Sequence, residues 1–595
     1  MKMILTGNEG IARGAYEAGV VIASGYPGTP STEILESIGK RYPEIRADWA
    51  PNEKVALEEV CGSAIGGVRS MCTMKHVGLN VAADPLFTIA YEGVNAGLVI
   101  VVADEPGMPS SQNEQDNRYY AKHAKVALVE PADSQECIDY MKEAFEISEK
   151  FDTVVILRLT TRVSHSKSLV EFKDRIEAPY KEYEKDIKKY IMVPANSRPK
   201  HVEMETERIP AMREYSNNTF LNRIEYNDKK IGVITNGMAY NHARSVFGEN
   251  ASYLKVGFSY PLPDKLFKEF SENVDTLYIV EENEPYMEEF AKAMGIECIG
   301  KEIFPICGEL NPQIIQDAVY GKTEDLKTPK ESEQDIPNRP PSLCPGCPHR
   351  GIFYEISKYK DSIVSTSDIG CYTLGMAPPL SIGDTVICMG AGFSAGIGFE
   401  RAFKAAGITN KKVFGFVGDS TFFHSGITGL VDMVYSNTNM VAVILDNSIT
   451  AMTGHQDNPS TGKNLKGEIA NVVDIKAVCK GCGIPENKIV EFDPYDLKAT
   501  ENAVRIAYES EGPFVLVSKR ECALIKDIMK QRAHLKCKVD PMVCISCKYC
   551  LDVGCPAISM KGVSVIDKTQ CNGCSICSQV CPTGAIQQME DYNGK

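Results

Sequence analysis

Residues 413–447, VFGFVGDSTFFHSGITGLVDMVYSNTNMVAVILDN, carry the clearest structural pattern in this 595-residue chain. An apolar run ends at Gly418-Asp419-Ser420, and a second one, MVAVIL, ends at Asp446-Asn447. Two such runs separated by a helical segment predict buried parallel strands joined by a helix. Because both strands end at the same sheet edge, we expect a carboxylate and an amide to lie together there.

The same alternation of strand and helix extends in both directions and predicts a multidomain α/β protein. Residues 1–180 form one α/β domain, with buried strands at 97–106 and 153–160. A polar, charged stretch at 181–228 is predicted as a linker, and 229–325 as a smaller central α/β domain. The Pro-rich segment 328–342 is a predicted boundary, before a third α/β domain at 343–530 and a cysteine-rich tail at 538–590.

Composition excludes several classes of function. A net charge of −15 argues against nucleic-acid binding, which needs basic surface. No apolar run is long enough to span a membrane, and the N-terminus lacks a secretory signal, so we expect a cytoplasmic protein. In a reducing compartment, 21 cysteines indicate metal binding or catalysis rather than disulfides.

Eight of these cysteines form two runs in the tail. The first run is Cys544, Cys547, Cys550 and Cys555, and the second is Cys571, Cys574, Cys577 and Cys581. In two-cluster ferredoxins the fourth cysteine of each run binds the other cluster. We therefore predict two [4Fe-4S] clusters, with a first cluster group (Cys544, Cys547, Cys550, Cys581) and a second cluster group (Cys555, Cys571, Cys574, Cys577).

Two features of the tail leave questions open. Paired C-x2-C motifs also suit zinc, although the three-in-a-row spacing with Cys-Pro in both runs favours clusters. The first run has four residues, Leu551 to Gly554, where the usual run has three. Cys537 lies outside both runs and is interpreted as a bystander.

The opening stretch resembles the thiamine diphosphate motif, written GDG and followed about thirty residues later by NN. Asp419 and Asn447 are then the side-chain ligands of Mg²⁺, which prefers hard oxygen donors. The resemblance adds the backbone carbonyl of Ile449, and it places Gly418 and Ser420 at the cofactor. Ser420 replaces a Gly and Asp446 replaces an Asn of the motif, and neither is a metal-ligand position. An ordinary strand–helix–strand crossover with a polar turn is the alternative.

A thiamine enzyme also needs a carboxylate against the aminopyrimidine ring. Members of the family carry this Glu at a helix start, nine residues before a helix-packing Gly. Glu53 and Gly62 have that spacing, so the resemblance implies Glu53 as the acid–base residue. A first-turn acid stabilised by the helix dipole is the alternative.

Thiamine diphosphate combined with a two-cluster tail resembles the 2-oxoacid:ferredoxin oxidoreductases, and among them the large subunits of the indolepyruvate type. The loop YPGTPST (26–32) resembles a family loop that places Thr29 against the reacting carbon. The motif CPGC (344–347) resembles the start of a third cluster site, whose four cysteines, here called the proximal group, are Cys344, Cys347, Cys371 and Cys522. Structural thiols or a zinc knuckle are the alternatives.

The resemblance implies an enzyme that oxidatively decarboxylates aryl-pyruvates, such as indole-3-pyruvate, with coenzyme A as co-substrate. Lys75 and His76 are predicted to contact substrate, and Arg118 is a candidate carboxylate fork. Expected partners are a smaller subunit in an α2β2 assembly and an external ferredoxin. Alternatives are the same chemistry on pyruvate or a branched-chain acid, a non-oxidative thiamine enzyme, and an electron-transfer subunit with an inactive thiamine fold.

Overall fold

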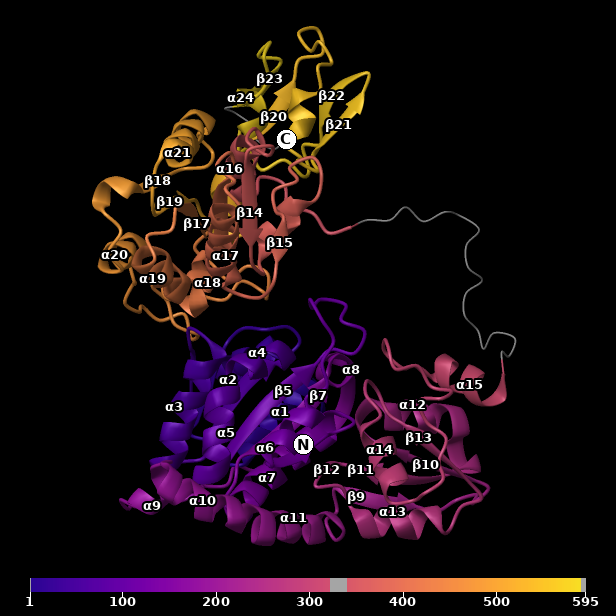
Figure 1. The fold of residues 1–595 in the computed structure, drawn as a ribbon. Coiled ribbons are helices and arrows are strands. Elements are labelled where there is room, and N and C mark those ends of the chain that lie inside the picture. Colours follow the sequence, from indigo (N-terminus) through magenta and orange to yellow (C-terminus); the bar gives the residue numbers. More distant parts are fainter. Residues whose placement is uncertain (1, 322–339, 590–595) are drawn as a thin grey trace. The chain divides into compact units, whose positions relative to one another are not determined.

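The computed structural model describes residues 2–321 and 340–589, which fall into two compact units, 1–334 and 335–595 (Figure 1). Each unit is described by itself. The boundary predicted at 328–342 lies largely outside the described residues.

Unit 1 contains a seven-stranded sheet of order β12-β6-β7-β5-β4-β2-β3. Its strands run parallel except β12, which pairs antiparallel with β6. The continuous apolar sequence of β5 is buried along its whole length, as expected for a central parallel strand. The strands are β2 (Ile22–Gly25), β3 (Arg46–Trp49), β4 (Ser70–Lys75), β5 (Leu98–Asp104), β6 (Ala127–Val129), β7 (Val155–Thr160) and β12 (Phe258–Tyr260).

Three helices of the same domain, the first, third and seventh, begin at a residue whose side chain caps them. Thr6 and Glu9 form a capping box at the start of the first helix, and Asn52 caps the third. A short sheet pairs β1 (Lys2–Thr6) with β8 (Lys167–Glu171). The helices are α1 (Gly7–Glu17), α2 (Thr32–Arg41), α3 (Glu53–Ile65), α4 (His76–Val81), α5 (Ala83–Glu92), α6 (Arg118–Ala124), α7 (Ser134–Phe151) and α8 (Thr161–His165).

The central domain of unit 1 is built on a four-stranded sheet of order β13-β10-β11-β9. Its strands are β9 (Asn222–Glu225), β10 (Ile231–Thr235), β11 (Ser252–Val256) and β13 (Thr276–Val280), and its helices are α12 (Gly237–Phe247), α13 (Asp264–Ser271), α14 (Tyr286–Ala293) and α15 (Pro312–Tyr320). The stretch predicted as a linker contains α9 (Ile187–Tyr190), α10 (Pro194–Glu203), the π-helix η1 (Met204–Arg208) and α11 (Ile209–Ser216). It also supplies the edge strand β9, so the central domain begins earlier than the sequence suggests.

Unit 2 is built on a six-stranded parallel sheet of order β15-β14-β16-β17-β19-β18. The two runs of the opening stretch are the adjacent strands β16 (Lys412–Gly418) and β17 (Met440–Asp446), both completely buried. The other strands are β14 (Ile363–Ser367), β15 (Thr385–Val386), β18 (Ile489–Phe492) and β19 (Phe514–Lys519). The helices include α16 (His349–Ser357), α17 (Ala391–Ala405), α18 (Asp419–Thr421), α19 (Ile427–Tyr435), α20 (Ile475–Gly481), α21 (Leu497–Glu509) and α22 (Lys526–Arg532).

The cysteine-rich tail of unit 2 consists of two small antiparallel sheets and two short helices. β20 (Lys536–Val539) pairs with β23 (Ile586–Met589), and β21 (Ile558–Lys561) pairs with β22 (Val563–Ile566). The helices α23 (Tyr549–Asp552) and α24 (Ile576–Gln579) each carry one cysteine, Cys550 of the first run and Cys577 of the second. The predicted fold class, α/β domains followed by a ferredoxin-like tail, is confirmed. Among the described residues no helix is long and apolar enough to cross a membrane.

Candidate functional site

Two carboxylates meet at the carboxyl edge of the unit 2 sheet. Asp419 follows β16 and Asp446 ends β17, and both side chains are buried. Burial and the charge of Asp446 raise the pKa of Asp419 to about 7. The Lys519 ammonium lies 3.6 Å from Asp446 and offsets part of this charge, and a divalent cation at Asp419 would offset the rest.

Amide oxygens complete this set of hard donors. Asn447 is buried, and its side-chain oxygen accepts the backbone N–H of Ile449 at 3.2 Å. Between them, Ser448 has a φ of +56°, which turns the chain sharply after the strand. Gly418, Asp419, Ser420, Asn447 and Ile449, predicted from separate strand ends, therefore lie along one edge, and their oxygen-rich composition fits Mg²⁺.

Three further residues of this edge were missed by the sequence analysis. The side-chain amide of Asn458 donates to Asp419 at 3.0 Å, and the His349 ring lies 3.5 Å from the Asn447 amide. Asp368 accepts the Gly390 N–H at 3.0 Å, and burial raises its pKa to about 8. The polar character of the loop 450–461 is the one signal in the sequence that could have led to Asn458.

The proximal group lies beside this edge. The Cys522 N–H donates to the Asn447 carbonyl at 2.9 Å. Burial raises the pKa of Cys371 to about 11, and the thiols of Cys522 and Cys344 are among the groups that raise it further, as is Asp419. Burial likewise raises the pKa of Cys347, which has Cys371 and Cys522 as neighbours. The structure therefore brings four cysteines together from three distant segments of sequence.

A cavity in the tail gathers the second cluster group. Cys555, Cys571, Cys574 and Cys577 all line it, as the exchange of fourth cysteines between runs predicts. Pro345 and Gly346 of the CPGC loop line the same cavity. This loop is fastened to the second run, because the Asn572 amide donates to the Pro345 carbonyl at 2.7 Å.

The first cluster group is more open. Cys547 is exposed and Cys550 is buried, and Cys547 and Cys544 are among the groups that act on the Cys550 thiol. The assignment of Cys581 to this group stays a prediction. Among the described residues no three His, Cys, Asp or Glu side chains have the geometry of a single-ion site. In a cubane each thiolate binds a different iron, so the ligands surround the cluster instead of converging on one atom.

In unit 1 the predicted acid–base residue is buried at the start of a helix. Glu53 is the first residue of α3, and only 4% of it is exposed. A Cβ added to Gly78 would lie 2.7 Å from the Glu53 carboxylate, so any larger residue there would displace the Glu53 side chain. Gly62, predicted as the helix-packing glycine, is exposed and has open space around it. That packing role is therefore wrong, and Gly78 makes the close contact with Glu53.

The predicted substrate residues lie near Glu53. Lys75 packs against the Gly28 position, next to Thr29, and its ammonium donates to Ser111 at 2.7 Å. Burial lowers the pKa of Lys75, while the charges of Glu105 and Glu53 oppose that shift.

His76 follows Lys75 and is completely buried. Its Nε2 lies 3.1 Å from the Asn113 carbonyl, and within the described part of the chain Nδ1 has no hydrogen-bond partner. The loop at 26–32, the end of strand β4 and the start of helix α4 therefore supply Thr29, Lys75 and His76 to one region.

Arg118 is not available to a substrate. Its side chain is completely buried and pairs with Asp116 and Glu281, both at 2.5 Å. It also donates to the carbonyls of Glu282 and Glu284. The prediction of Arg118 as a carboxylate fork is therefore wrong, because all three guanidinium nitrogens already donate hydrogen bonds within unit 1.

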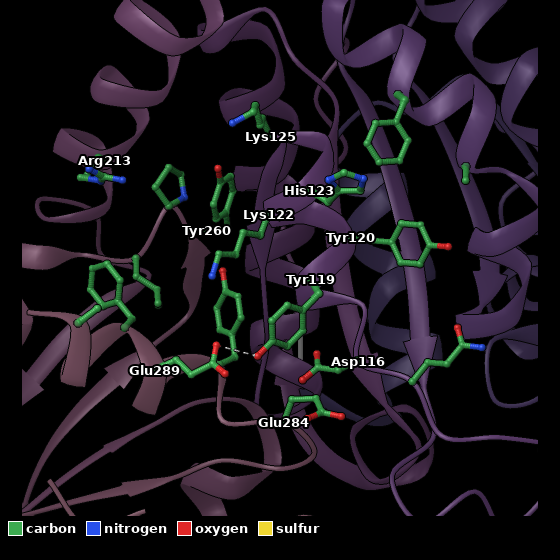
Figure 2. A pocket seen from close by; sticks show the side chains of 18 residues that line it. Asp116, Tyr119, Tyr120, Lys122, His123, Lys125, Arg213, Tyr260, Glu284 and Glu289 are labelled. Carbon is green, nitrogen blue, oxygen red and sulfur yellow. Dashed lines mark hydrogen bonds between the residues drawn. The ribbon is translucent and has the colours of Figure 1, made fainter.

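A large cavity of unit 1 lies elsewhere. It has a volume of about 1440 Å³, and Figure 2 shows aromatic rings along it, with the Tyr119 hydroxyl donating to Glu289 at 3.2 Å. Lys122, Lys125 and Arg213 also line it, but Glu53, Thr29, Lys75 and His76 do not. This cavity is therefore separate from the region around Glu53.

Comparison with known proteins agrees with this layout. Residues 13–230 match the model described as pyruvate flavodoxin/ferredoxin oxidoreductase, thiamine diP-binding, and residues 368–518 match the C-terminal TPP-binding domain of thiamine pyrophosphate enzymes. Residues 564–587 match a 4Fe-4S binding domain. Indolepyruvate oxidoreductase subunit IorA of Methanothermobacter thermautotrophicus is 40% identical over 98% of this chain and 97% of its own, and that of Pyrococcus horikoshii is 38% identical over 99% and 97%.

This chain belongs to the IorA family. It is thus a 2-oxoacid:ferredoxin oxidoreductase of the indolepyruvate type, as its motifs predicted. A shorter match, 27% over 29% of this chain, is to the 2-oxoglutarate synthase subunit KorA of Methanothermobacter marburgensis.

The predicted site residues of this IorA-family chain fall in different matched ranges, and some fall in none. Thr29, Glu53 and His76 lie within the first range, and Asp419 and Asn447 within the second. The third range covers the second run with Cys581, whereas the first run and Cys344, Cys347 and Cys522 lie outside every matched range. For those cysteines, the structural arrangement described above is the supporting observation.

Proposed function

We propose that this chain catalyses the oxidative decarboxylation of aryl-pyruvates, with indole-3-pyruvate as the preferred substrate. Coenzyme A takes up the acyl group to give the aryl-acetyl-CoA and CO₂, and the two electrons pass one at a time to ferredoxin. The observation that carries this proposal is the near full-length identity to relatives named as indolepyruvate oxidoreductase subunits.

The chain supplies two sets of residues for Mg²⁺ and thiamine diphosphate. Asp419, Asn447 and the Ile449 carbonyl hold the metal, and the buried Asp419–Asp446 pair supports this role because a cation removes their mutual repulsion. When bound, thiamine diphosphate accepts the electron pair that is freed as CO₂ leaves. Glu53 holds or releases a proton at its carboxylate oxygen, in a buried position suited to acid–base work.

Three cluster sites form the electron path. The proximal group adjoins the metal edge through the hydrogen bond between Cys522 and Asn447. The CPGC loop then meets the cavity of the second cluster group, and the first cluster group contains the exposed Cys547. We infer the order proximal group, second cluster group, first cluster group, external ferredoxin.

Substrate and partners complete the proposal. Thr29 faces the reacting carbon, and Lys75 and His76 contact the substrate. Arg118 takes no part in substrate binding, because its side chain is paired with Asp116 and Glu281. Because the relatives are named as subunits, a smaller partner subunit is expected, in an α2β2 assembly.

The test is ferredoxin-linked turnover of this chain with its partner subunit on a panel of indole-3-pyruvate, phenylpyruvate, pyruvate, 2-oxoglutarate and a branched-chain acid. We expect the aryl substrates to have the highest kcat/KM. Faster turnover of pyruvate would overturn the choice of substrate. An electron-transfer subunit with an inactive thiamine fold instead predicts no thiamine diphosphate in the purified protein, which mass spectrometry checks.

A further inference from the structure

Cys537, interpreted from sequence as a bystander, lies directly against the second cluster group. It is 1% exposed on β20 and lines the same cavity as Cys555, Cys571, Cys574 and Cys577. Its backbone N–H donates to the Cys571 sulfur at 3.4 Å. Its thiol also interacts with the thiols of Cys571 and Cys577. The bystander interpretation is therefore wrong.

The other half of the tail has an equivalent contact. Ser564 on β22 is buried, and its hydroxyl lies 2.8 Å from the sulfur of Cys550 in the first cluster group. Ser564 also reaches the Met560 thioether at 3.3 Å. A cluster-bound Cys550 is a charged thiolate and hence the stronger acceptor, so Ser564 must be the donor to it.

The two contacts occupy the same position in the internal repeat. Cys537 stands seven residues before Cys544, the first cysteine of the first run, and Ser564 stands seven residues before Cys571, the first cysteine of the second run. Each residue lies on the strand that leads into one run and touches the sulfurs of the other cluster group. The arrangement thus repeats the exchange of fourth cysteines between the runs.

The two donors differ in strength. A hydroxyl is a full hydrogen-bond donor, whereas a thiol is a weak one. A hydrogen bond to a ligand sulfur stabilises the more negative, reduced cluster and so raises its reduction potential. The stronger donor, Ser564, serves the first cluster group, which also contains the exposed Cys547.

We propose that Cys537 and Ser564 are a matched pair of tuning residues that hold the first cluster group at a higher reduction potential than the second. Electrons arriving at the second cluster group then move downhill toward the exposed end of the tail. Cys537 is a tuning residue and not a ligand, because four other cysteines already surround its cavity. The proposal rests on the ligand assignment given under the proposed function.

The experiment is a redox titration followed by electron paramagnetic resonance on the full chain, with iron content measured in parallel. Ser564→Ala removes the hydroxyl, and we expect the reduced-to-oxidised ratio of one tail cluster to fall about two- to tenfold at its wild-type midpoint potential, as loss of one hydrogen bond implies. Cys537→Ser supplies a stronger donor and should raise that ratio for the other cluster. Cys537→Ala should lower it.

The controls are Cys479→Ala, which removes a buried thiol elsewhere in unit 2, and Ser559→Ala, which removes an exposed hydroxyl on the neighbouring strand. Neither should change a potential. The proposal is overturned if the Ser564 and Cys537 variants titrate like wild type, or if Cys537→Ala loses a cluster's iron while Cys537→Ser keeps it, since Cys537 would then be a ligand. Wild-type protein without tail clusters would instead refute the proposed ligand assignment.

Discussion

At the scale of single residues, Glu53 gives the sharpest prediction. Glu53→Gln keeps the shape of the side chain but removes the acid–base group, so we expect kcat to fall about 10²- to 10⁴-fold. Thiamine diphosphate content, measured by mass spectrometry, should stay close to wild type. Glu58→Gln on the same helix is the matched control, because Glu58 pairs with Lys54 at the surface. Wild-type turnover by Glu53→Gln would remove Glu53 from the mechanism.

The residues that sequence predicted well are those fixed by local order along the chain. Asp419 and Asn447 follow adjacent buried strands, so strand pairing alone brings them to one edge. Arg118 and Cys537 were misjudged because their surroundings come from distant segments, and Gly62 because no segment of the described chain packs against it. Arg118 forms an ion pair with Glu281 of the central domain. Cys537 reaches its cavity through the pairing of β20 with β23, some fifty residues apart.

At the scale of elements, Arg350 explains the lengthened loop of the first run. This buried side chain of α16 donates to the Val553 carbonyl at 3.1 Å and also to the Gly554 carbonyl. It bonds the Leu343 and Cys344 carbonyls as well. The lengthened loop is therefore fastened, through the Val553 and Gly554 carbonyls, to the thiamine domain beside the CPGC motif.

We expect Arg350→Lys to loosen this attachment. Lysine carries a point charge and cannot serve several carbonyls at once, so the unsatisfied carbonyls should cost about 1–3 kcal/mol. Hydrogen exchange of residues 549–555 should accelerate, and substrate should reduce the tail clusters more slowly at unchanged iron content. Arg505→Lys, in an exposed pair with Glu509, is the control. Unchanged exchange would show that other contacts hold the loop.

A buried network of charges joins the first domain of unit 1 to the central domain. Arg158 pairs with Asp104 and Glu130, and the Asn236 amide donates to Glu130 at 2.7 Å. Glu282 lies buried beside them and accepts the Leu310 N–H at 3.2 Å. Burial raises the pKa of Glu282 from 4.5 to about 7, although Arg158 opposes the shift.

This network predicts a dependence of stability on pH. The folded pKa of Glu282 lies above its unfolded value, so its stabilisation is complete below pH 4.5 and is lost as pH rises through about 7. The loss amounts to about 3 kcal/mol. Native-state hydrogen exchange at strand β13, followed from pH 5 to 8, should show this decline. Glu282→Gln should flatten it, whereas Glu284→Gln at the surface should not. The same slope in Glu282→Gln would assign the effect to another group.

At the scale of the whole molecule, sequence predicted the order of domains because each carries its own motif. It did not predict the helices within 181–228, because α10 has no buried residue and so shows no apolar pattern. The helices there are held by scattered contacts, such as the buried Met204 and Met212. Motif spacing thus predicted the chemistry, while long-range packing determined where the domains begin.

The electron path gives the last prediction, which concerns unit 2 as a whole. Cys371→Ser removes one thiol of the proximal group, so we expect iron to fall from about twelve to about eight atoms per chain. The tail clusters should remain, because their cysteines belong to the tail and those of the second cluster group line a cavity that contains no cysteine of the proximal group. Substrate should then no longer reduce them, although dithionite still should, as rapid-mixing spectroscopy would record. Cys388→Ser, at an exposed cysteine of the same domain, is the control. Normal reduction of the tail by substrate in Cys371→Ser would mean that electrons bypass the proximal group.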